Sequence, residues 1–289
     1  VKKLRRKMID EVTKLENMVH EKTLDLTNED FDFMLAHIGD PDPKLRDKTI
    51  YILFCRLFLE NGGCLTREKA KLIVNKALKH DRLFEEIEAS EPNDLVFTRT
   101  FTALLYCIFL DVDTKGNYQG FLSSVQRKQL LDDATLYLQK ERDYRGFVID
   151  KGWAHAPAHG GDFLDQAANH PQFGKTRVHD ALKSLQTIIL SVKTVFVADE
   201  ESRFDNCIVT MLENEWLTGN QLVEWADKID QKNAKLNFRD SLFLPRMHTW
   251  HAFLKSAYFK IKAKKLDDQV FANYIEHTLE QYYLRNGFI

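Results

Sequence analysis

Glycine and proline are scarce in this chain, which has 12 glycines and 6 prolines among its 289 residues. Together they make up roughly 6% of the sequence, about half of their usual share. A β-sandwich or β-barrel needs a turn about every 8–12 residues, and these two residues build many of those turns. The shortage therefore disfavours all-β folds and predicts an all-α protein with long helices and short connections.

Cysteines, net charge and long apolar runs are also limited. The four cysteines form no CxxC pair, and the net charge is only -2. The apolar runs 50–59 and 103–110 are far shorter than the ~20 residues that span a bilayer. An amphipathic stretch follows the basic residues 1–7, so we expect no secretory signal. These features predict a cytosolic protein without a membrane partner, and they disfavour nucleic acid as a partner.

Several strong catalytic motifs are absent. The sequence contains no GxxxxGK[ST], no GxGxxG after a strand, no GxSxG and no HExxH. These motifs indicate P-loop phosphate binding, dinucleotide binding, a nucleophilic serine and a zinc protease site. The sequence therefore identifies no established reaction.

Helix signals are present throughout the chain instead. Apolar residues spaced by three or four predict a first helix over residues 4–19. Helix N-caps are predicted at Thr27, Asp42, Thr66, Ser123 and Thr218. No convincing strand alternation is found. Further predicted helices are 43–59, 67–79, 94–111, 124–141, 157–169, 176–197, 200–214, 238–262 and 267–285.

An acidic residue followed by an arginine recurs near the start of successive apolar segments. The arginines are Arg46, Arg99, Arg145 and Arg203, separated by 53, 46 and 58 residues. HEAT and armadillo repeats have periods of about 40–47 residues. The pattern predicts a HEAT/armadillo-like helical-repeat solenoid, an α-α superhelix, that forms one domain over residues 1–289. The alternative is a helical bundle whose helix caps happen to be charged.

Residues 145–162, RGFVIDKGWAHAPAHGGD, have the most unusual local composition, with four glycines, one tryptophan and two histidines. On a continuous helix, His155, His159 and Asp162 would lie on one face. Two imidazoles and a carboxylate are a ligand set that suits catalytic zinc or non-haem iron. Trp153 would form a wall of such a site. Pro157 weakens this prediction, because it would kink the helix or mark its first turn.

Two further interpretations of the same residues remain open. His155, His159 and Asp162 would belong to a structural polar network, or they would line a pocket that binds a ligand without a metal. Asp143, Arg145 and Asp150 would then bond to the histidine rings, or form an ion pair and an N-cap. The candidate ligand-binding residues are Trp153, His155, His159, Asp162, Arg145 and Asp143.

At this motif the sequence resembles a bacterial family of unknown function. The family signature is an acidic residue and RG, followed by GWAHAxAHGxD, with helical-repeat segments on both sides. Proline at 157 replaces a residue more compatible with a helix. The resemblance covers roughly residues 28–215 and implies a helical-repeat fold but no reaction. The matching residues are Asp143, Arg145, Gly146, Gly152, Trp153, Ala154, His155, Ala156, Ala158, His159, Gly160 and Asp162.

Three functional hypotheses follow. The first is a binding or scaffold module that holds a peptide, a protein or a small molecule in a concave face near Trp153. The second is a metal-dependent hydrolase or oxygenase with His155, His159 and Asp162 as ligands of zinc or iron. The third is a HEAT-like protein that binds nucleic acid, which the near-neutral charge disfavours.

Overall fold

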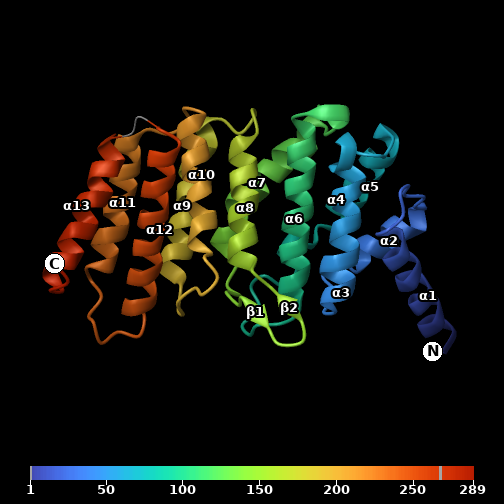
Figure 1. Ribbon diagram of the computed structural model, residues 1–289, viewed down its shortest axis with the longest axis horizontal. Helices are drawn as coiled ribbons and strands as arrows, with labels where there is room; N and C mark the ends of the chain where they lie inside the picture. Colours follow the sequence, from blue (N-terminus) through green and yellow to red (C-terminus); the bar gives the residue numbers. More distant parts are fainter. Residues whose placement is uncertain (1, 267–268) are drawn as a thin grey trace. The chain divides into compact units, whose positions relative to one another are not determined.

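The computed structural model of the protein describes residues 2–266 and 269–289, and most of these residues lie in helices (Figure 1). Contacts within the chain define two compact units. Unit 1 consists of residues 1–130 and 145–156, and unit 2 of residues 131–144 and 157–289. The prediction of an all-α protein is confirmed, whereas the single domain over 1–289 stays a prediction.

Unit 1 consists of short and long helices and one small hairpin. Helix α7 (Ser124–Lys140) begins in this unit and ends in unit 2. The elements of unit 1 are α1 (Lys2–Met18), α2 (Asn28–Ala36), α3 (Pro43–Leu45), η1 (Arg46–Tyr51), α4 (Ile52–Phe58), η2 (Glu60–Gly62), α5 (Arg67–His80), η3 (Arg82–Phe84), α6 (Leu95–Asp113), η4 (Gly116–Tyr118), β1 (Phe147–Val148) and β2 (Gly152–Trp153).

Unit 2 follows with longer helices joined by short loops. Helix α8 begins at Ala156, the last residue of unit 1, and continues into unit 2. The elements of unit 2 are α8 (Ala156–Asn169), η5 (Lys175–Arg177), α9 (Val178–Ser191), α10 (Glu201–Glu213), α11 (Gly219–Asn233), α12 (Phe243–Ala263) and α13 (Gln269–Arg285).

The predicted N-caps are confirmed. The side chains of Thr27 and Thr218 accept hydrogen bonds in capping boxes with Asp30 and Gln221. Thr66 caps α5, and Ser123 exchanges the same reciprocal hydrogen bonds with Gln126 at the start of α7. At Asp42, the cap is followed by Pro43 at the first helical position. Local chemistry therefore determined these helix starts, because each cap satisfies otherwise unpaired backbone N–H groups.

Several predicted helix boundaries were wrong. The helix predicted over 43–59 contains a π-helical turn, η1, between α3 and α4. The helix predicted over 176–197 ends at Ser191, because Val192 is extended and its side chain and that of Phe196 are buried in the core. Helix α12 begins at 243 rather than 238, because a hydrogen-bonded turn between Asn237 and Asp240 precedes it. The predicted start of the last helix, at 267, lies outside the described residues.

The structure contains one short hairpin that the search for strand alternation did not reveal. β1 and β2 form an antiparallel pair in which Phe147 faces Trp153 and Val148 faces Gly152. Each strand has only two residues, too few to show the alternation of polar and apolar residues by which strands are recognised in a sequence.

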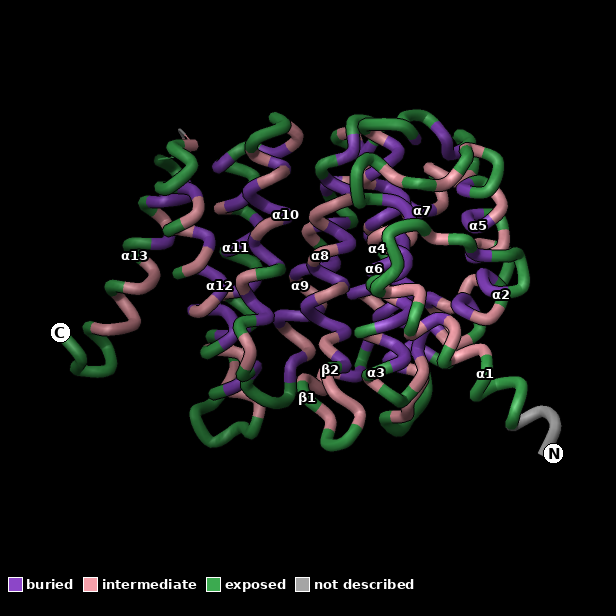
Figure 2. Tube along the Cα trace, turned by 45° about the vertical axis from the view of Figure 1, so that its right-hand side comes forward, coloured by how far each residue is buried: buried purple, intermediate pink, exposed green. Residues whose placement is uncertain are grey.

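The core of unit 1 is centred on α6, most of whose residues are buried (Figure 2). This helix, Leu95–Asp113, is long and apolar enough to cross a membrane by length and composition. However, 83% of this apolar stretch is buried inside the protein, as expected for a core helix. The uninterrupted apolar run 103–110 covers less than half of this helix, so its length gave no indication of a helix long enough to span a membrane.

Candidate functional site

The β1–β2 hairpin contains the first half of the unusual motif. Its ladder continues beyond the strands, because Ala154 N–H donates to Gly146 O at 2.9 Å and His155 N–H donates to Arg145 O at 3.1 Å. Ala154 packs with Val96 and Phe97 of α6 in a buried cluster. One side of the hairpin is thus attached to the core of unit 1.

The side chain of Arg46, on η1, anchors the hairpin. Its guanidinium donates from Nη2 to Lys151 O and from Nη1 to Asp40 O, both at 2.7 Å. The guanidinium carbon also lies 4.2 Å from the ring centroid of Phe97. Arg46 is completely buried, and its Nε bonds to Asp47 at 2.7 Å. A buried arginine with this many partners fixes the hairpin turn because releasing it would leave the charge and the carbonyls unpaired.

Two further contacts determine the conformation of the turn. Lys151 Nζ bonds both carboxylate oxygens of Asp94, at 2.8 and 2.7 Å, at the start of α6. Gly152 has a φ of +78°, and a Cβ there would lie 3.1 Å from Pro43 Cβ and 3.3 Å from Arg46 Nη2. Glycine is therefore needed at 152 for both its backbone conformation and its close approach to η1.

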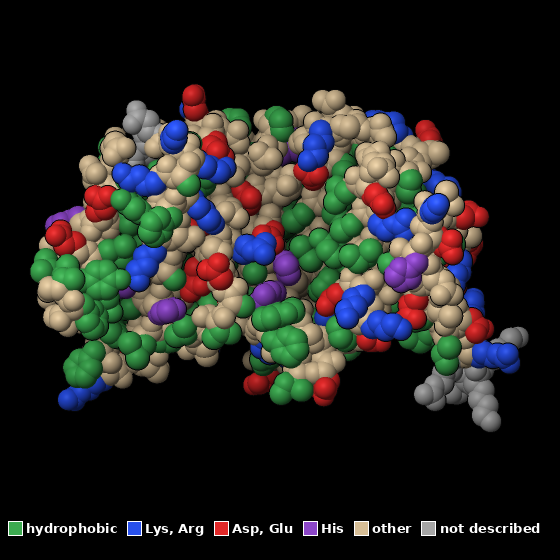
Figure 3. All heavy atoms as spheres, viewed as in Figure 1, with side chains coloured by type: hydrophobic (Ala, Val, Ile, Leu, Met, Phe, Trp, Pro, Cys, Tyr) green, Lys and Arg blue, Asp and Glu red, His purple; other side chains and the backbone are tan. Residues whose placement is uncertain are grey.

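The opposite face of the hairpin exposes large apolar side chains. Phe147 is 60% exposed, Ile149 80% and Trp153 41%. The rings of Phe147 and Trp153 meet edge to face, with centroids 5.2 Å apart, and the indole lies 4.2 Å from the imidazole of His155. Figure 3 shows apolar atoms gathered over the hairpin that Figure 1 labels β1 and β2. We call Phe147, Ile149 and Trp153 the hairpin patch.

Arg145 and Asp143 lie in different units. Arg145 Nη2 donates to Asn93 O at 2.7 Å and thereby holds the base of the hairpin in unit 1. Asp143 is buried in unit 2, and its N–H donates to Glu141 Oε1 at 2.9 Å. Tyr137 O–H donates to the other oxygen of Glu141 at 3.2 Å, so this carboxylate organises the end of α7.

His155 is not on the helix that carries His159 and Asp162. Helix α8 begins at Ala156, and His155 precedes it with a left-handed φ of +49°. The argument that all three side chains share one helix face was therefore wrong. Pro157 is the reason, because proline is accommodated in the first turn of a helix but not in its interior.

His159 and Asp162 form a hydrogen-bonded pair one turn apart on α8. His159 Nδ1 lies 3.0 Å from Asp162 Oδ2, and Arg203 Nη1 of α10 donates to Asp162 Oδ1 at 2.8 Å. Burial alone would raise the pKa of Asp162, but the hydrogen bonds and charges of His159 and Arg203 lower it overall. The pair fixes the orientation of the imidazole, and both carboxylate oxygens are already engaged.

The two adjacent glycines of the motif allow α8 to pack closely within unit 2. A Cβ at Gly160 would lie 2.4 Å from Leu138 Cδ2 of α7. A Cβ at Gly161 would lie 3.1 Å from the backbone carbonyl of Arg203 on α10. These glycines are therefore explained by helix packing, without a ligand.

The described residues contain no group of three or more His, Cys, Asp or Glu side chains that could hold a metal ion. The predicted zinc or iron site at His155, His159 and Asp162 stays a prediction without support from ligand geometry. Two further histidines, His248 and His251, lie three residues apart on α12, and His251 is buried with its ring 4.2 Å from that of Tyr282. Burial lowers the pKa of His251 to about 4.

Sequence reasoning missed two features of unit 1. Arg46 was recognised only as the start of a repeat, because its partner Lys151 lies 105 residues away along the chain. A cavity of about 820 Å³ between α2, α5 and α6 gave no sequence signal, and none of its lining residues is a predicted ligand-binding residue. The sequence signal at Arg46 was its position directly after the capped helix start at Asp42 and Pro43.

Comparison with known proteins gives one match. The family described as "Protein of unknown function (DUF2785)" matches residues 83–259, which include the whole motif. The match begins later and ends later than the resemblance over 28–215 predicted. No curated protein and no solved structure matches the chain.

Proposed function

Because the chain belongs to the DUF2785 family, whose description names no reaction, we propose a function from its own surfaces. We propose that it is a binding module that recognises a protein partner through the hairpin patch, Phe147, Ile149 and Trp153. The observation that carries this proposal is the exposure of these three side chains on a hairpin that is firmly anchored on its other side.

The exposure of the patch is unusual for a segment of this size. Three large apolar side chains lie within seven residues, at 60%, 80% and 41% exposure. Exposed apolar groups that cluster in this way mark interaction sites more often than single exposed residues do. Tryptophan in particular is enriched among the residues that dominate binding energy at protein interfaces.

The anchoring of the hairpin supports recognition by a preformed surface. Arg46 holds the turn carbonyl of Lys151, and Lys151 itself pairs with Asp94. A segment that is already ordered loses less conformational entropy when it binds. The contact between the rings of His155 and Trp153 further restricts the indole.

We also propose that unit 2 is a helical-repeat array of the HEAT or armadillo type. Contacts in this unit join α9 with α11, α11 with α13, and α10 with α12. In these three pairs a helix packs on the second helix after it, as expected for two rows of stacked helices. Helix α12 also contacts α9, α11 and α13. The arginines of the predicted repeat do not add support, because Arg145 lies outside the helices and Arg203 is half-exposed.

The other predicted site residues have secondary roles in this proposal. Arg145 and His155 position the hairpin, whereas Asp143, His159 and Asp162 stabilise unit 2. We propose the cytosolic location predicted from the sequence, whose four cysteines form no CxxC pair.

Site-specific cross-linking tests the proposal. A photoreactive phenylalanine analogue is placed at Ile149 of the full chain, and the protein is irradiated in cells that naturally produce it. The matched control carries the analogue at Val125, which is also in unit 1 and is 74% exposed. We expect a discrete adduct from position 149 and none from position 125, and the adduct must disappear when Trp153→Ala is added.

The captured protein is then purified and titrated against the wild-type chain. Trp153→Ala should weaken the affinity by about tenfold or more, as expected for a central aromatic residue. Val125→Ala should leave it unchanged. No adduct at 149, equal adducts at both positions, or an adduct that persists in Trp153→Ala would each overturn the proposal.

A further inference from the structure

A second surface of unit 1, the cavity between α2, α5 and α6, has the properties of a small-molecule site. Its volume is about 820 Å³, within the range of roughly 300–1,000 Å³ typical of ligand pockets. Leu35 and Ile38 line one side, and Ala77 and Leu105 line another. These residues provide an apolar surface for the body of a ligand.

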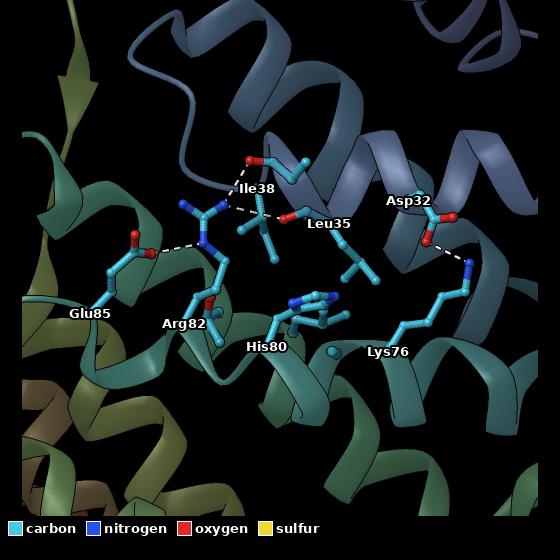
Figure 4. A pocket seen from close by; sticks show the side chains of 11 residues that line it. Asp32, Leu35, Ile38, Lys76, His80, Arg82 and Glu85 are labelled. Atoms are coloured by element: carbon cyan, nitrogen blue, oxygen red, sulfur yellow. Dashed lines mark hydrogen bonds and ion pairs between the residues drawn. The ribbon is translucent and has the colours of Figure 1, made fainter.

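Two ion pairs flank this apolar surface (Figure 4). On one side Lys76 Nζ pairs with Asp32, and on the other Arg82 Nε pairs with Glu85 at 2.8 Å. Arg82 also donates to Ala36 O at 2.6 Å, which fixes its guanidinium. Since two acidic side chains offset two basic ones, the cavity carries little net charge.

Polar groups with unused hydrogen-bonding capacity face the same cavity. His80 makes no hydrogen bond or ion pair with residues 2–266 and 269–289, and Figure 4 shows its ring between the two ion pairs. Lys76 Nζ has three N–H groups and bonds only Asp32 among the described residues. The cavity therefore offers hydrogen-bond donors beyond those its own ion pairs use.

Thr102 of α6 provides an independent indication of a ligand. Thr102 is only 4% exposed, and its hydroxyl oxygen is buried without a hydrogen-bond partner among the described residues. Thr102 nevertheless lines the cavity. A buried hydroxyl without a partner is costly, and a bound ligand would satisfy it.

We propose that this cavity binds a small organic monoanion, namely a carboxylate attached to an apolar body. The apolar part packs on Leu35 and Leu105, while the carboxylate accepts hydrogen bonds from Lys76 and His80. The hydroxyl of Thr102 donates to the ligand as well. The near-neutral lining favours a single negative charge over the double charge of a phosphate, because only the spare donors are left to stabilise it.

Isothermal titration of the full chain with 2-naphthoate tests this proposal. The cationic counterpart, 2-naphthylmethylamine, has the same apolar body and the opposite charge. We expect saturable one-to-one binding of the naphthoate, and affinity at least about tenfold weaker for the amine. Absence of saturable naphthoate binding, or equal affinity for both probes, would overturn the proposal.

Matched variants test whether naphthoate binds in this cavity. Lys76→Ala should weaken naphthoate binding by about fivefold or more, whereas Lys79→Ala, on the exposed face of the same helix, should leave it unchanged. Ala77→Trp, which fills the cavity, should abolish binding. Equal effects of Lys76→Ala and Lys79→Ala would show that the probe responds only to overall charge, against the proposal.

Substitutions of two threonines on α6 distinguish an effect on ligand affinity from an effect on stability. Thr100 and Thr102 are both buried with hydroxyl oxygens that lack partners among the described residues, but only Thr102 lines the cavity. Thr100→Val and Thr102→Val should both maintain or raise the melting temperature, because each removes an unsatisfied hydroxyl. Only Thr102→Val should weaken naphthoate binding. Equal naphthoate affinity in the two variants would contradict the assigned role of Thr102.

Discussion

The two halves of the motif RGFVIDKGWAHAPAHGGD use similar residue types for opposite purposes. In the first half, Arg46 anchors one side of the hairpin, and the other side exposes Phe147 and Trp153. In the second half, α8 directs Asp162 towards Arg203 and uses Gly160 to pack closely on α7. The boundary between the two compact units falls between Ala156 and Pro157, within this motif.

This difference shows that local density of glycine, histidine and tryptophan does not by itself indicate a catalytic centre. Glycine at 152 permits a left-handed turn, whereas glycine at 160 makes room for a neighbouring helix. His155 contacts the indole of Trp153, whereas His159 forms a hydrogen bond with a carboxylate. Substitutions in the two halves should therefore have different consequences for binding and for stability.

The largest effect is expected for Arg46→Met, which removes the anchor of the first half. The partly exposed partners Asp47, Asp40 O and Lys151 O would lose the guanidinium of the buried Arg46 as a donor. We expect the free energy of unfolding to fall by about 3–5 kcal/mol, as for the breaking of other buried ionic contacts. Denaturant titration measures this change, and a loss similar to that of an exposed arginine such as Arg239 would contradict the anchoring role.

Gly160→Ala tests close packing in the second half. The new methyl group would collide with Leu138 and Tyr137, both of which are fully buried. Overpacking costs about 1–3 kcal/mol and the higher helix propensity of alanine returns up to ~1, so we expect a net loss of about 1–2 kcal/mol. The control is Gly174→Ala, where the methyl meets nothing within 4 Å and only the positive φ matters. A Gly160→Ala protein as stable as wild type would refute this packing.

Asp162→Asn tests the ion pair of α8 and should show a characteristic pH dependence. The folded-state pKa of Asp162 is lowered, so its charge stabilises the fold above the ordinary aspartate pKa of about 3.9. This stabilisation is lost as the pH falls through the lower folded-state value. At pH 7 we expect the substitution to cost about 1–2 kcal/mol, as for hydrogen bonds to charged groups.

Thermal melts of Asp162→Asn and wild type between pH 7 and pH 2 measure this difference. The two curves should converge at the acidic end of the range. A difference that stays constant with pH would show that the charge of Asp162 contributes nothing to stability.

The smallest effect on stability is expected for Ile149→Ser in the hairpin patch. Because this side chain is 80% exposed, its replacement should change the free energy of unfolding by less than about 0.5 kcal/mol. The same substitution should reduce partner affinity if the hairpin patch is the binding surface. A large fall in melting temperature would instead show that Ile149 is part of the core.

Much of the helical structure could be predicted from local sequence. The caps at Thr27, Thr66 and Thr218 lie where their side chains match the adjacent backbone N–H groups. The end of α9 could not be predicted in this way, because it depends on burial of Val192 and Phe196 against other parts of unit 2. The hairpin was missed because its two-residue strands are stabilised mainly by side chains elsewhere in unit 1.

The candidate site was only partly predictable. Composition singled out residues 145–162, whose role as a site stays a prediction. Of the two effects expected of Pro157, a kink or a first turn, the structure shows the first turn of α8. The alignment of His155 with His159 and Asp162 failed because the helix begins after His155. The cavity beside His80 had no signal at all, because its lining comes from α2, α5 and α6.

The sequence by itself determined the helical class, most helix starts and the segment where unusual chemistry is concentrated. These properties depend on residues within a few positions of one another, through caps, proline and apolar spacing. Only the tertiary structure decided that Arg46 holds a hairpin 105 residues away and that Thr102 borders a cavity. Such relations depend on packing between distant segments, which local patterns do not record.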